Sequence, residues 1–337
     1  MSSNKTSRRR FVQTSAAAGA GITFGVPLLA KAGSEHTIKI ATLAPDGSSW
    51  HKAFKSVARQ IKDQTDGAIS VKVYAGGVMG DEKAMVRKIR SGQLDGAAVT
   101  SVGLGQINEQ LLMLQLPLLF KNYDELDRTR TAMKPKFDKL LEDGGVRTTG
   151  YGDVGFAYLF SNSPIKKPSD AKSTKMWVWE DDPVSKETMK VAGINAVPLG
   201  VPDVLSSLQT GVIDAFPNSP YGAIALQWYS KARYITNLKL SMSIGASVLS
   251  TKTWDKLSDA HKEIIQGITE ETHGKLLKRI RADNKKAIAT LKDKGIEVVE
   301  PDDFGAWKSM ADTVRTNLTG SLFDKALVDE MMGLLGR

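Results

Sequence analysis

Hydrophobic and polar positions follow two different periods along the chain, one typical of strands and the other of helices. Residues 37–43 alternate as in a strand, whereas the apolar side chains of residues 50–61 recur every three or four positions, as in an amphipathic helix. Two further strands are predicted at 69–74 and 94–99, with a helix between them that begins at Asp81. Because strands and helices alternate, the pattern predicts an α/β fold.

A short pattern occurs twice in the sequence. Residues 91–97 (SGQLDGA) and 210–216 (TGVIDAF) both read as a helix end, a glycine cap and a short apolar strand. The repeat favours two equivalent α/β lobes, whose ligand cleft is expected beyond the carboxyl ends of the strands. The polar, helix-period stretch at 258–294 contains no proline and is long enough to run along both lobes.

The first 32 residues have the features of an export signal. Three consecutive arginines, Arg8 to Arg10, precede an apolar stretch at 16–30, and Ala30-Lys31-Ala32 has the small-x-small pattern of a cleavage site. A membrane anchor is the alternative, but this stretch is shorter than the roughly 20 apolar residues that a span needs, and it contains Pro27. We therefore predict a twin-arginine signal peptide at 1–32, and a periplasmic protein that does not span the membrane after cleavage.

The charge and length of the remaining chain narrow the function. The formal net charge of +9 falls to +4 without residues 1–32, which is too little to indicate nucleic-acid binding. The chain has no cysteine, so disulfides and thiol chemistry are excluded. About 305 residues suffice for two lobes. We predict one lobe from 36–157 plus 246–290 and the other from 158–245 plus 291–337.

No catalytic, metal or cofactor motif is recognisable. The histidines lack metal-ligand spacing and lie beside no GxSxG nucleophile motif, and the glycines match neither a Walker A loop nor GxGxxG. These histidines are His36, His51, His261 and His273. The acidic run Glu180-Asp181-Asp182 could bind a cation, but it precedes Pro183 and a predicted helix, where acids cap free amides. We expect no enzyme activity, metal or cofactor.

Aromatic side chains are the more informative candidates for a binding site. Phe156, Tyr158 and Phe160 alternate along one predicted strand, and Trp177 and Trp179 along another, so each set shares one face. Ordinary core packing would explain them as well. However, tryptophan is costly to bury unless its indole N–H has a partner, which makes plain core packing less favourable for it. Two tryptophans on one strand face would also form a broad apolar wall, which suits a hydrophobic ligand.

Several blocks in order resemble one family, the DctP-type substrate-binding subunits of tripartite ATP-independent periplasmic (TRAP) transporters. The resemblance covers nearly the whole chain after the signal. The blocks are Gly80-Asp81-Glu82, Ser91-Gly92-Gln93-Leu94-Asp95, Leu116-Pro117-Leu118-Leu119-Phe120, Lys167-Pro168-Ser169-Asp170, Leu208-Gln209-Thr210-Gly211-Val212-Ile213-Asp214 with Asn218, and Thr253-Trp254-Asp255-Lys256-Leu257-Ser258. The resemblance implies a two-lobed periplasmic binding protein, type II-like, that closes by a hinge on a small molecule and delivers it to a TRAP-type membrane permease.

The sequence departs from the family at the positions that bind carboxylates. Trp177 stands where most members have an arginine whose guanidinium pairs with a ligand carboxylate in two hydrogen bonds. A second arginine often follows Gly-Phe, but Ala157 follows Gly155-Phe156, and Val201 replaces a common aromatic. A small dicarboxylate or a sialic-acid-like ligand is therefore not expected.

We thus predict a largely apolar or aromatic ligand, such as a lipid or a lipid-like acid, that is bound by residues of both lobes. The predicted ligand-binding residues are Trp177, Trp179, Asn218, Phe156, Tyr158, Trp50, Tyr74, Ser101, Val201 and Phe216. Asn218 is implied by the resemblance alone. Two alternatives remain: a periplasmic lipid or solute shuttle or sensor partner with the same fold, and, least favoured, an α/β hydrolase or lyase.

Overall fold

The computed structural model describes residues 36–337. The predicted signal peptide at 1–32 lies outside them, so export by the twin-arginine route stays a prediction. Within residues 36–337, no helix is long and apolar enough to cross a membrane.

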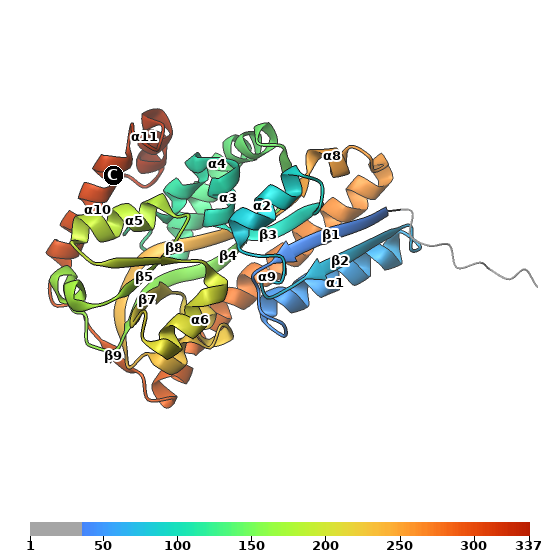
Figure 1. Ribbon diagram of the computed structural model, residues 1–337. Coiled ribbons are helices and arrows are strands. Elements are labelled where there is room, and N and C mark those ends of the chain that lie inside the picture. The colour runs from blue at the N-terminus through green and yellow to red at the C-terminus, as the bar shows by residue number, and fades with distance from the viewer. Residues whose placement is uncertain (1–35) are drawn as a thin grey trace, which may run out of the picture. The chain divides into compact units, whose positions relative to one another are not determined.

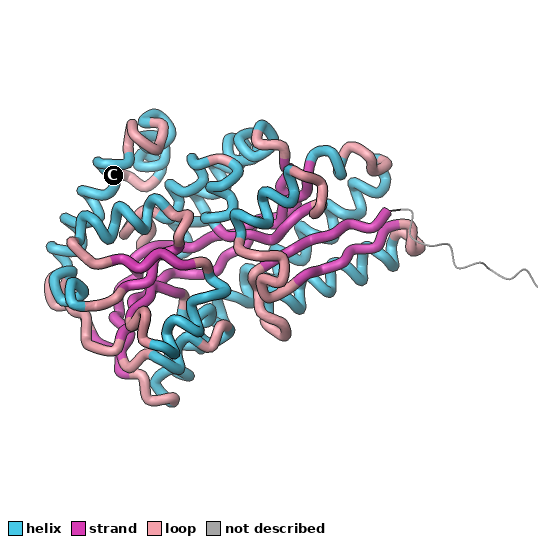
Figure 2. The backbone as a smooth tube through the Cα atoms, in the orientation of Figure 1, coloured by secondary structure: helices cyan, strands magenta, loops and turns pink. Residues whose placement is uncertain are grey.

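One mixed sheet of nine strands organises the described residues (Figures 1 and 2). Its order is β2-β1-β3-β8-β4-β7-β5-β6, and β9 pairs with β8 outside this path. The strands are β1 (His36–Thr42), β2 (Ile69–Tyr74), β3 (Gly96–Thr100), β4 (Val146–Ser161), β5 (Met176–Trp179), β6 (Ala196–Leu199), β7 (Ala215–Asn218), β8 (Tyr234–Ser250) and β9 (Glu297–Val299).

Helices flank the sheet along its length (Figure 2). The α-helices are α1 (Ser49–Gln64), α2 (Glu82–Arg90), α3 (Ser101–Ile107), α4 (Tyr123–Asp143), α5 (Pro183–Ala192), α6 (Val201–Thr210), α7 (Pro220–Ala225), α8 (Thr251–Trp254), α9 (Asp259–Asp293), α10 (Phe304–Leu318) and α11 (Lys325–Leu334). Three 3-10 helices connect them: η1 (Glu109–Gln115), η2 (Pro168–Ser173) and η3 (Trp228–Lys231).

The two lobes share the long antiparallel strands β4 and β8. These strands pair from Val146↔Ser250 to Ser161↔Tyr234. The first lobe adds β1, β2 and β3 at one end, the second adds β5, β6 and β7 at the other, and the long helix α9 runs behind the middle of the sheet (Figure 1). The predicted two-lobed α/β fold with a long helix is therefore confirmed. The predicted lobe boundaries stay a prediction, because β4 and β8 cross them without a break.

The repeated sequence pattern forms the same turn in both lobes. Gly92 and Gly211 both have positive φ angles, 75° and 73°, as helix-ending glycines do. An aspartate three residues after each glycine accepts a 2.8 Å hydrogen bond from a backbone N–H. Asp95 accepts it from Lys39 in β1, and Asp214 accepts it from Lys175, the residue just before β5. Each aspartate therefore fixes a parallel strand pair, which explains its recurrence.

The local predictions agree with the structure to within a few residues. Ser48 caps α1 and Asp81 caps α2, each by accepting a backbone N–H. The strand predicted at 94–99 instead spans Gly96–Thr100, because Leu94 and Asp95 belong to the turn after α2.

The hydrophobic core lies on both faces of the sheet. In the first lobe, Ile38 of β1 packs in one cluster with Ile61 of α1 and Ile265 of α9. In the second lobe, Val178 of β5 packs in another cluster that contains Trp307 of α10. These clusters hold the strands rigidly, so that the strand ends can carry a site.

Candidate functional site

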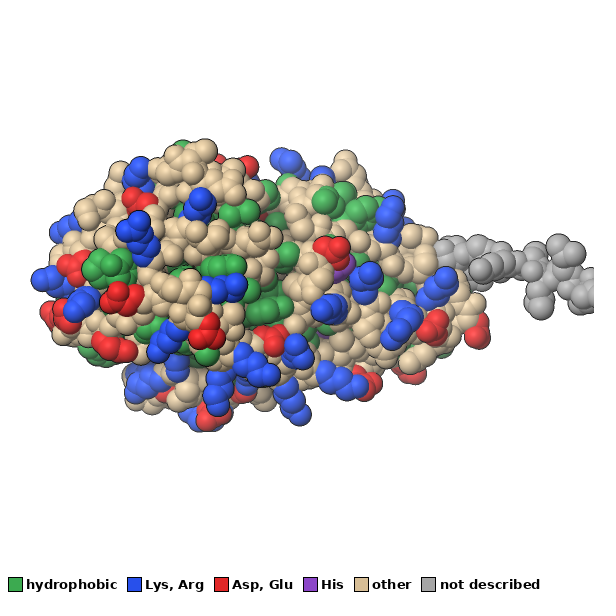
Figure 3. Space-filling view, turned by 90° about the horizontal axis from the view of Figure 1, so that it is seen from below, with side chains coloured by type: hydrophobic (Ala, Val, Ile, Leu, Met, Phe, Trp, Pro, Cys, Tyr) green, Lys and Arg blue, Asp and Glu red, His purple; other side chains and the backbone are tan. Residues whose placement is uncertain are grey.

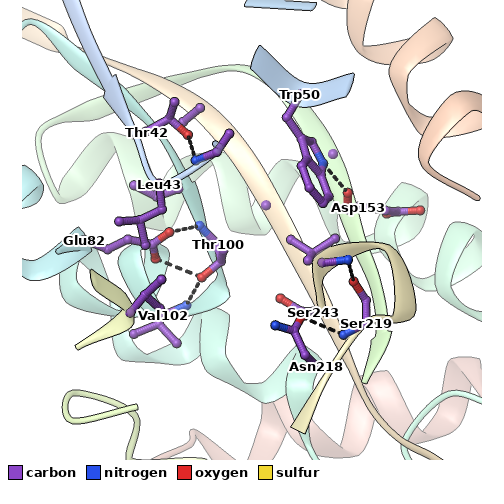
Figure 4. A pocket seen from close by; sticks show the side chains of 18 of the residues that line it. Thr42, Leu43, Trp50, Glu82, Thr100, Val102, Asp153, Asn218, Ser219 and Ser243 are labelled. Carbon is purple, nitrogen blue, oxygen red and sulfur yellow. Dashed lines mark hydrogen bonds between the residues drawn. The ribbon is translucent and has the colours of Figure 1, made fainter. Parts of the chain in front are cut away.

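A cavity of about 210 Å³ lies where the carboxyl ends of strands from both lobes meet. Its lining includes Thr42 and Thr100 at the ends of β1 and β3, and Trp179 and Asn218 at the ends of β5 and β7. In Figure 4, Thr42 and Thr100 lie on one side of the cavity and Asn218 on the other. The cleft between the lobes therefore occupies the predicted position, beyond the carboxyl ends of parallel strands.

Indole rings form much of the apolar lining. Trp177 is buried, donates its Nε1–H to the Leu199 carbonyl at 3.0 Å and meets Trp228 edge to face, with 5.1 Å between the ring centroids. Trp50 enters from α1, donates to the Asp153 carbonyl at 3.2 Å and packs against Tyr221. Both indole N–H groups thus have protein partners, so neither ring needs a hydrogen bond from a ligand.

The ionisable groups that line the cavity are acids and one histidine, His273. Among the described residues that line it, none is Lys or Arg; the carboxyl groups belong to Glu82, Asp153 and Asp182. Burial raises the pKa of Glu82 to about 8, although its carboxyl accepts hydrogen bonds from Thr100 and Gly103. The cavity therefore offers no cation to a carboxylate, and it carries less negative charge than three ionised acids would give.

Asp153 belongs to a buried ion-pair network behind the cavity. Its two carboxylate oxygens accept 2.7 Å hydrogen bonds from Arg130 of α4 and Arg281 of α9. Both arginines also bind Asp127. Because each charge is paired, the network joins α4, β4 and α9 where the two lobes meet, without adding net charge.

The aspartate that caps the helix after the acidic run was predicted correctly. Asp182 accepts the backbone N–H groups of Val184 and Ser185 at the start of α5, and burial raises its pKa. Gln115 of η1 also donates to this carboxyl at 2.7 Å. Asp182 therefore stabilises a helix and connects it to another element.

Five of the predicted ligand-binding residues line the cavity, and they come from both lobes. They are Trp50, Trp177, Trp179, Val201 and Asn218. The structure brings these side chains together from α1, β5, α6 and β7. Their role in binding a ligand stays a prediction.

The other five predicted residues do not line the cavity. Phe156 packs on Tyr123, Phe216 stacks on Phe160, and Lys72 lies 4.9 Å from the Tyr74 ring centroid. The remaining two, Tyr158 and Ser101, are buried, and Ser101 Oγ is hydrogen-bonded to the backbone of Ile244. These five side chains serve packing in this structure.

Trp228 is the largest of the lining residues that the sequence analysis did not predict. It follows α7 in a short 3-10 helix, outside any alternating strand or helical stripe, so its sequence neighbours gave no sign of its position. It packs edge to face on both Trp177 and Phe216. The apolar wall is therefore made by Trp177 and Trp228, and Phe216 supports it from behind.

Asp81 and Trp179 join the two lobes directly. Asp81 at the start of α2 accepts the Trp179 Nε1–H at 2.8 Å and the Val201 backbone N–H at 3.2 Å. The neighbouring Lys83 pairs with Asp181 at 2.7 Å. Desolvation raises the pKa of Asp81, and the hydrogen bonds from Glu82, Trp179 and Val201 oppose this effect. Trp179 thus holds the lobes together as well as lining the cavity.

Replacing Trp179 with phenylalanine is expected to favour an open protein. The substitution keeps an aromatic ring but removes the N–H group that donates to Asp81. A hydrogen bond to a charged group is worth about 1.5–3 kcal/mol, so the equilibrium between closed and open protein should shift toward the open form by about ten- to hundredfold. Small-angle scattering should then show a larger radius of gyration than for the wild type. Trp307→Phe is the matched control, because its indole bonds to Lys166 away from the cavity. An unchanged radius for Trp179→Phe would contradict the interlobe role.

The fold and the cavity together define a two-lobed binding protein for a small solute. Comparison with known proteins gives the family: residues 40–319 match the model of bacterial extracellular solute-binding protein, family 7 (DctP), and the chain belongs to this family. This assignment confirms the resemblance found in the sequence. The family consists of extracytoplasmic solute-binding components of TRAP transporters, which deliver ligand to a membrane permease.

Relatives of known name and structure agree with the assignment. A solute-binding protein of Chromohalobacter salexigens is 26% identical over 77% of each chain, and the sialic acid-binding periplasmic protein SiaP of Vibrio cholerae is 24% identical over 83% of this chain and 89% of its own. The TRAP periplasmic solute-binding protein of Citrobacter koseri, solved with bound D-glucuronate, is 27% identical. It covers 88% of this chain and 99% of its own, with a TM-score of 0.81.

Proposed function

We propose that this protein is a non-catalytic TRAP solute-binding subunit that closes on a small, uncharged and largely apolar or aromatic ligand. The observation that carries the proposal is the cavity lining. Trp177 and Trp228 form a wall, and none of the described residues that line the cavity is Lys or Arg. Lobe closure would cover the ligand with residues from both strand-end regions. The membrane permease would then receive it from the opened protein.

Apolar burial provides a large favourable contribution to binding. Covering roughly 300 Å² of apolar ligand surface contributes on the order of 7 kcal/mol at about 25 cal/mol per Å², before the cost of closure and of lost motion. That value is close to the roughly 8 kcal/mol of micromolar binding. Apolar contact can therefore supply much of the binding free energy, and hydrogen bonds from the protein would have to offset the cost of closure and of lost motion.

The named ligands of two relatives provide the contrast. D-glucuronate is bound in the Citrobacter koseri protein, and the Vibrio cholerae protein is named for sialic acid. Both ligands are carboxylic acids, whose charge needs a paired cation when it is desolvated. The resemblance implies an arginine where Trp177 stands, and none of the described residues that line this cavity is Lys or Arg.

Titration calorimetry with D-glucuronate tests this proposal. We expect no heat of binding from the wild-type protein at millimolar sugar acid, and none from sialic acid. Charges of both signs are interspersed on the face shown in Figure 3, so this face is not expected to concentrate these anions either. Micromolar binding of either acid would contradict an uncharged ligand, although the protein would remain a solute-binding subunit.

We further propose export by the twin-arginine route. Replacing Arg8 and Arg9 together with lysine should abolish this route, because the pair precedes the apolar stretch that the export machinery recognises. Cell fractionation and immunoblotting should show the variant in the cytoplasm and the wild type in the periplasm. Replacement of Lys5 with arginine, outside the pair, is the control. Periplasmic accumulation of the double variant would contradict the route.

A further inference from the structure

The long strand β8 presents a row of three serines and one glycine to the cavity. Ser241, Ser243, Gly245 and Ser247 all line it, at every second position of a strand that runs through both lobes. Successive side chains of a strand alternate between its faces, so residues at this spacing share one face. Figure 4 shows Ser243 on the same side of the cavity as Asn218.

The partner strand β4 has only small residues opposite this row. Ser241 pairs with Ala157, Ser243 with Gly155, Gly245 with Gly152 and Ser247 with Gly150. Every residue opposite the row is thus alanine or glycine. Gly150 and Gly155 make room for His273 and Asn284 of α9, whose atoms lie 2.5 and 2.6 Å from where a Cβ would be, whereas the space at Gly152 is open.

The third serine of the row is already committed to a protein partner. Ser247 Oγ lies 3.0 Å from His273 Nε2, and His273 Nδ1 lies 2.8 Å from the Thr269 carbonyl oxygen. A carbonyl can only accept, so Nδ1 carries the proton. Burial lowers the pKa of His273, which keeps the ring neutral and leaves Nε2 to accept the Ser247 hydroxyl proton. Ser247 therefore stabilises the packing of α9 on the sheet.

The other two serines and one amide remain available. The hydroxyl groups of Ser241 and Ser243 have no hydrogen-bond partner among residues 36–337, and both residues are half-buried. Asn218 uses its Oδ1 to accept the Ser219 N–H at 2.7 Å, and its amide N–H groups have no partner in the same part of the chain. Asn218 and Ser241 pair with Tyr158 and Ala157 of β4, where the pairing with β8 shifts between Ala157 and Leu159, and both residues line the cavity.

We propose that Ser241, Ser243 and Asn218 form a polar strip that binds a neutral hydroxyl, carbonyl or amide group of the ligand, while Trp177 and Trp228 contact its apolar body. The ligand class is then an uncharged amphipathic molecule, with a ring or chain on one side and a hydrogen-bonding group on the other. This inference rests on the proposed function and adds the polar requirement to it.

Hydroxyl and amide groups suit such a ligand better than they suit an acid. A serine hydroxyl can both donate and accept, so the strip matches an alcohol or an amide without a counter-ion. Each partly buried polar atom that stays without a partner lowers affinity. A pure hydrocarbon would leave the strip unpaired, and a carboxylate would lack a cation.

Four monocyclic probes of similar size separate these possibilities: 2-phenylethanol, phenylacetamide, ethylbenzene and phenylacetate. Titration calorimetry or thermal shift should detect tighter binding of the alcohol or the amide than of ethylbenzene, by roughly three- to tenfold for one hydrogen bond. Phenylacetate should bind most weakly. The full chain without its signal segment is the protein to use, since residues 36–337 contain both walls of the cavity.

Variants of the strip identify the groups responsible. Ser241→Ala combined with Ser243→Ala should reduce the preference for the alcohol or amide over ethylbenzene to about onefold, while binding of ethylbenzene itself is retained. Ser309→Ala is the matched control, because this serine is exposed on α10, away from the cavity. Thermal unfolding of the double variant without probe verifies that it folds.

The outcomes distinguish the strip from the proposed function. Equal affinity for the alcohol, the amide and ethylbenzene, or a preference that survives in the double variant, overturns the polar strip but leaves an apolar site. Tightest binding of phenylacetate, or binding of none of the four, overturns both the strip and the uncharged, aromatic ligand class.

Discussion

Replacing Trp177 with alanine is expected to weaken ligand binding so far that the purified protein no longer carries the ligand that the wild type retains. Truncation of a well-packed tryptophan at the centre of a binding site typically costs 2 kcal/mol or more, which is roughly thirtyfold in affinity. Trp177 meets this description, because it is only 5% exposed, lines the cavity and packs against Trp228. Native mass spectrometry should show the variant empty under conditions where the wild type is occupied.

A second tryptophan separates lost binding from lost stability. Trp307 is equally buried but lies in the second-lobe core outside the cavity lining, so Trp307→Ala should reduce stability and retain ligand. Trp177→Arg offers the complementary test, since it restores the cation that the family resemblance implies. We expect it to lose the native ligand and to gain measurable affinity for D-glucuronate. Unchanged occupancy of Trp177→Ala would show that Trp177 is not part of the wall.

Replacing Asp153 with asparagine is expected to lower the free energy of unfolding by about 3–5 kcal/mol. The side chain of Asp153 is 0% exposed and pairs with both Arg130 and Arg281, so the substitution leaves these two arginines with one carboxylate, Asp127, and one positive charge uncompensated. Because these arginines come from α4 and α9, the loss should also loosen the junction of the lobes. Urea-induced unfolding followed by circular dichroism measures the effect.

An exposed ion pair provides the control for Asp153. Asp143 pairs with Lys139 on the surface of α4 and its side chain is 58% exposed, so Asp143→Asn should change the free energy of unfolding by less than about 1 kcal/mol. A loss for Asp153→Asn as small as that of the control would contradict the structural importance of the network.

The fold was largely predictable because it depends on local patterns. Helix caps such as Ser48 and Asp81 act on backbone groups a few residues away, so their sequence signals suffice. The repeated glycine and aspartate pattern likewise predicts a turn in each lobe. The position of the cavity followed from the same logic, because parallel strands of an α/β sheet direct their carboxyl ends to one edge.

The face of each aromatic side chain was less predictable. The alternation of Phe156 and Tyr158 predicted a strand, but it did not indicate whether the strand face that carries them lines a cavity or packs in the core. Irregularities in the pairing of β4 after Asp153 and after Ala157 also interrupt simple alternation at this point. Trp228, by contrast, reaches the cavity through tertiary packing alone.

Long-range polar partners were not predictable from sequence. Asp153 and Arg281 are 128 residues apart, and nothing near either residue indicates that they meet. The bonds from Trp179 and Val201 to Asp81 also depend on the approach of the two lobes. Sequence periodicity specifies elements, whereas these contacts follow from how the elements are arranged.

The most direct test of an uncharged ligand is to identify what the protein carries in the cell. The protein should be purified from the periplasm of the bacterium that produces it, weighed by native mass spectrometry and then denatured to release its ligand for identification. We predict a small neutral molecule with an apolar ring or chain and a hydroxyl, carbonyl or amide group. Release of a sugar acid such as D-glucuronate would contradict the account.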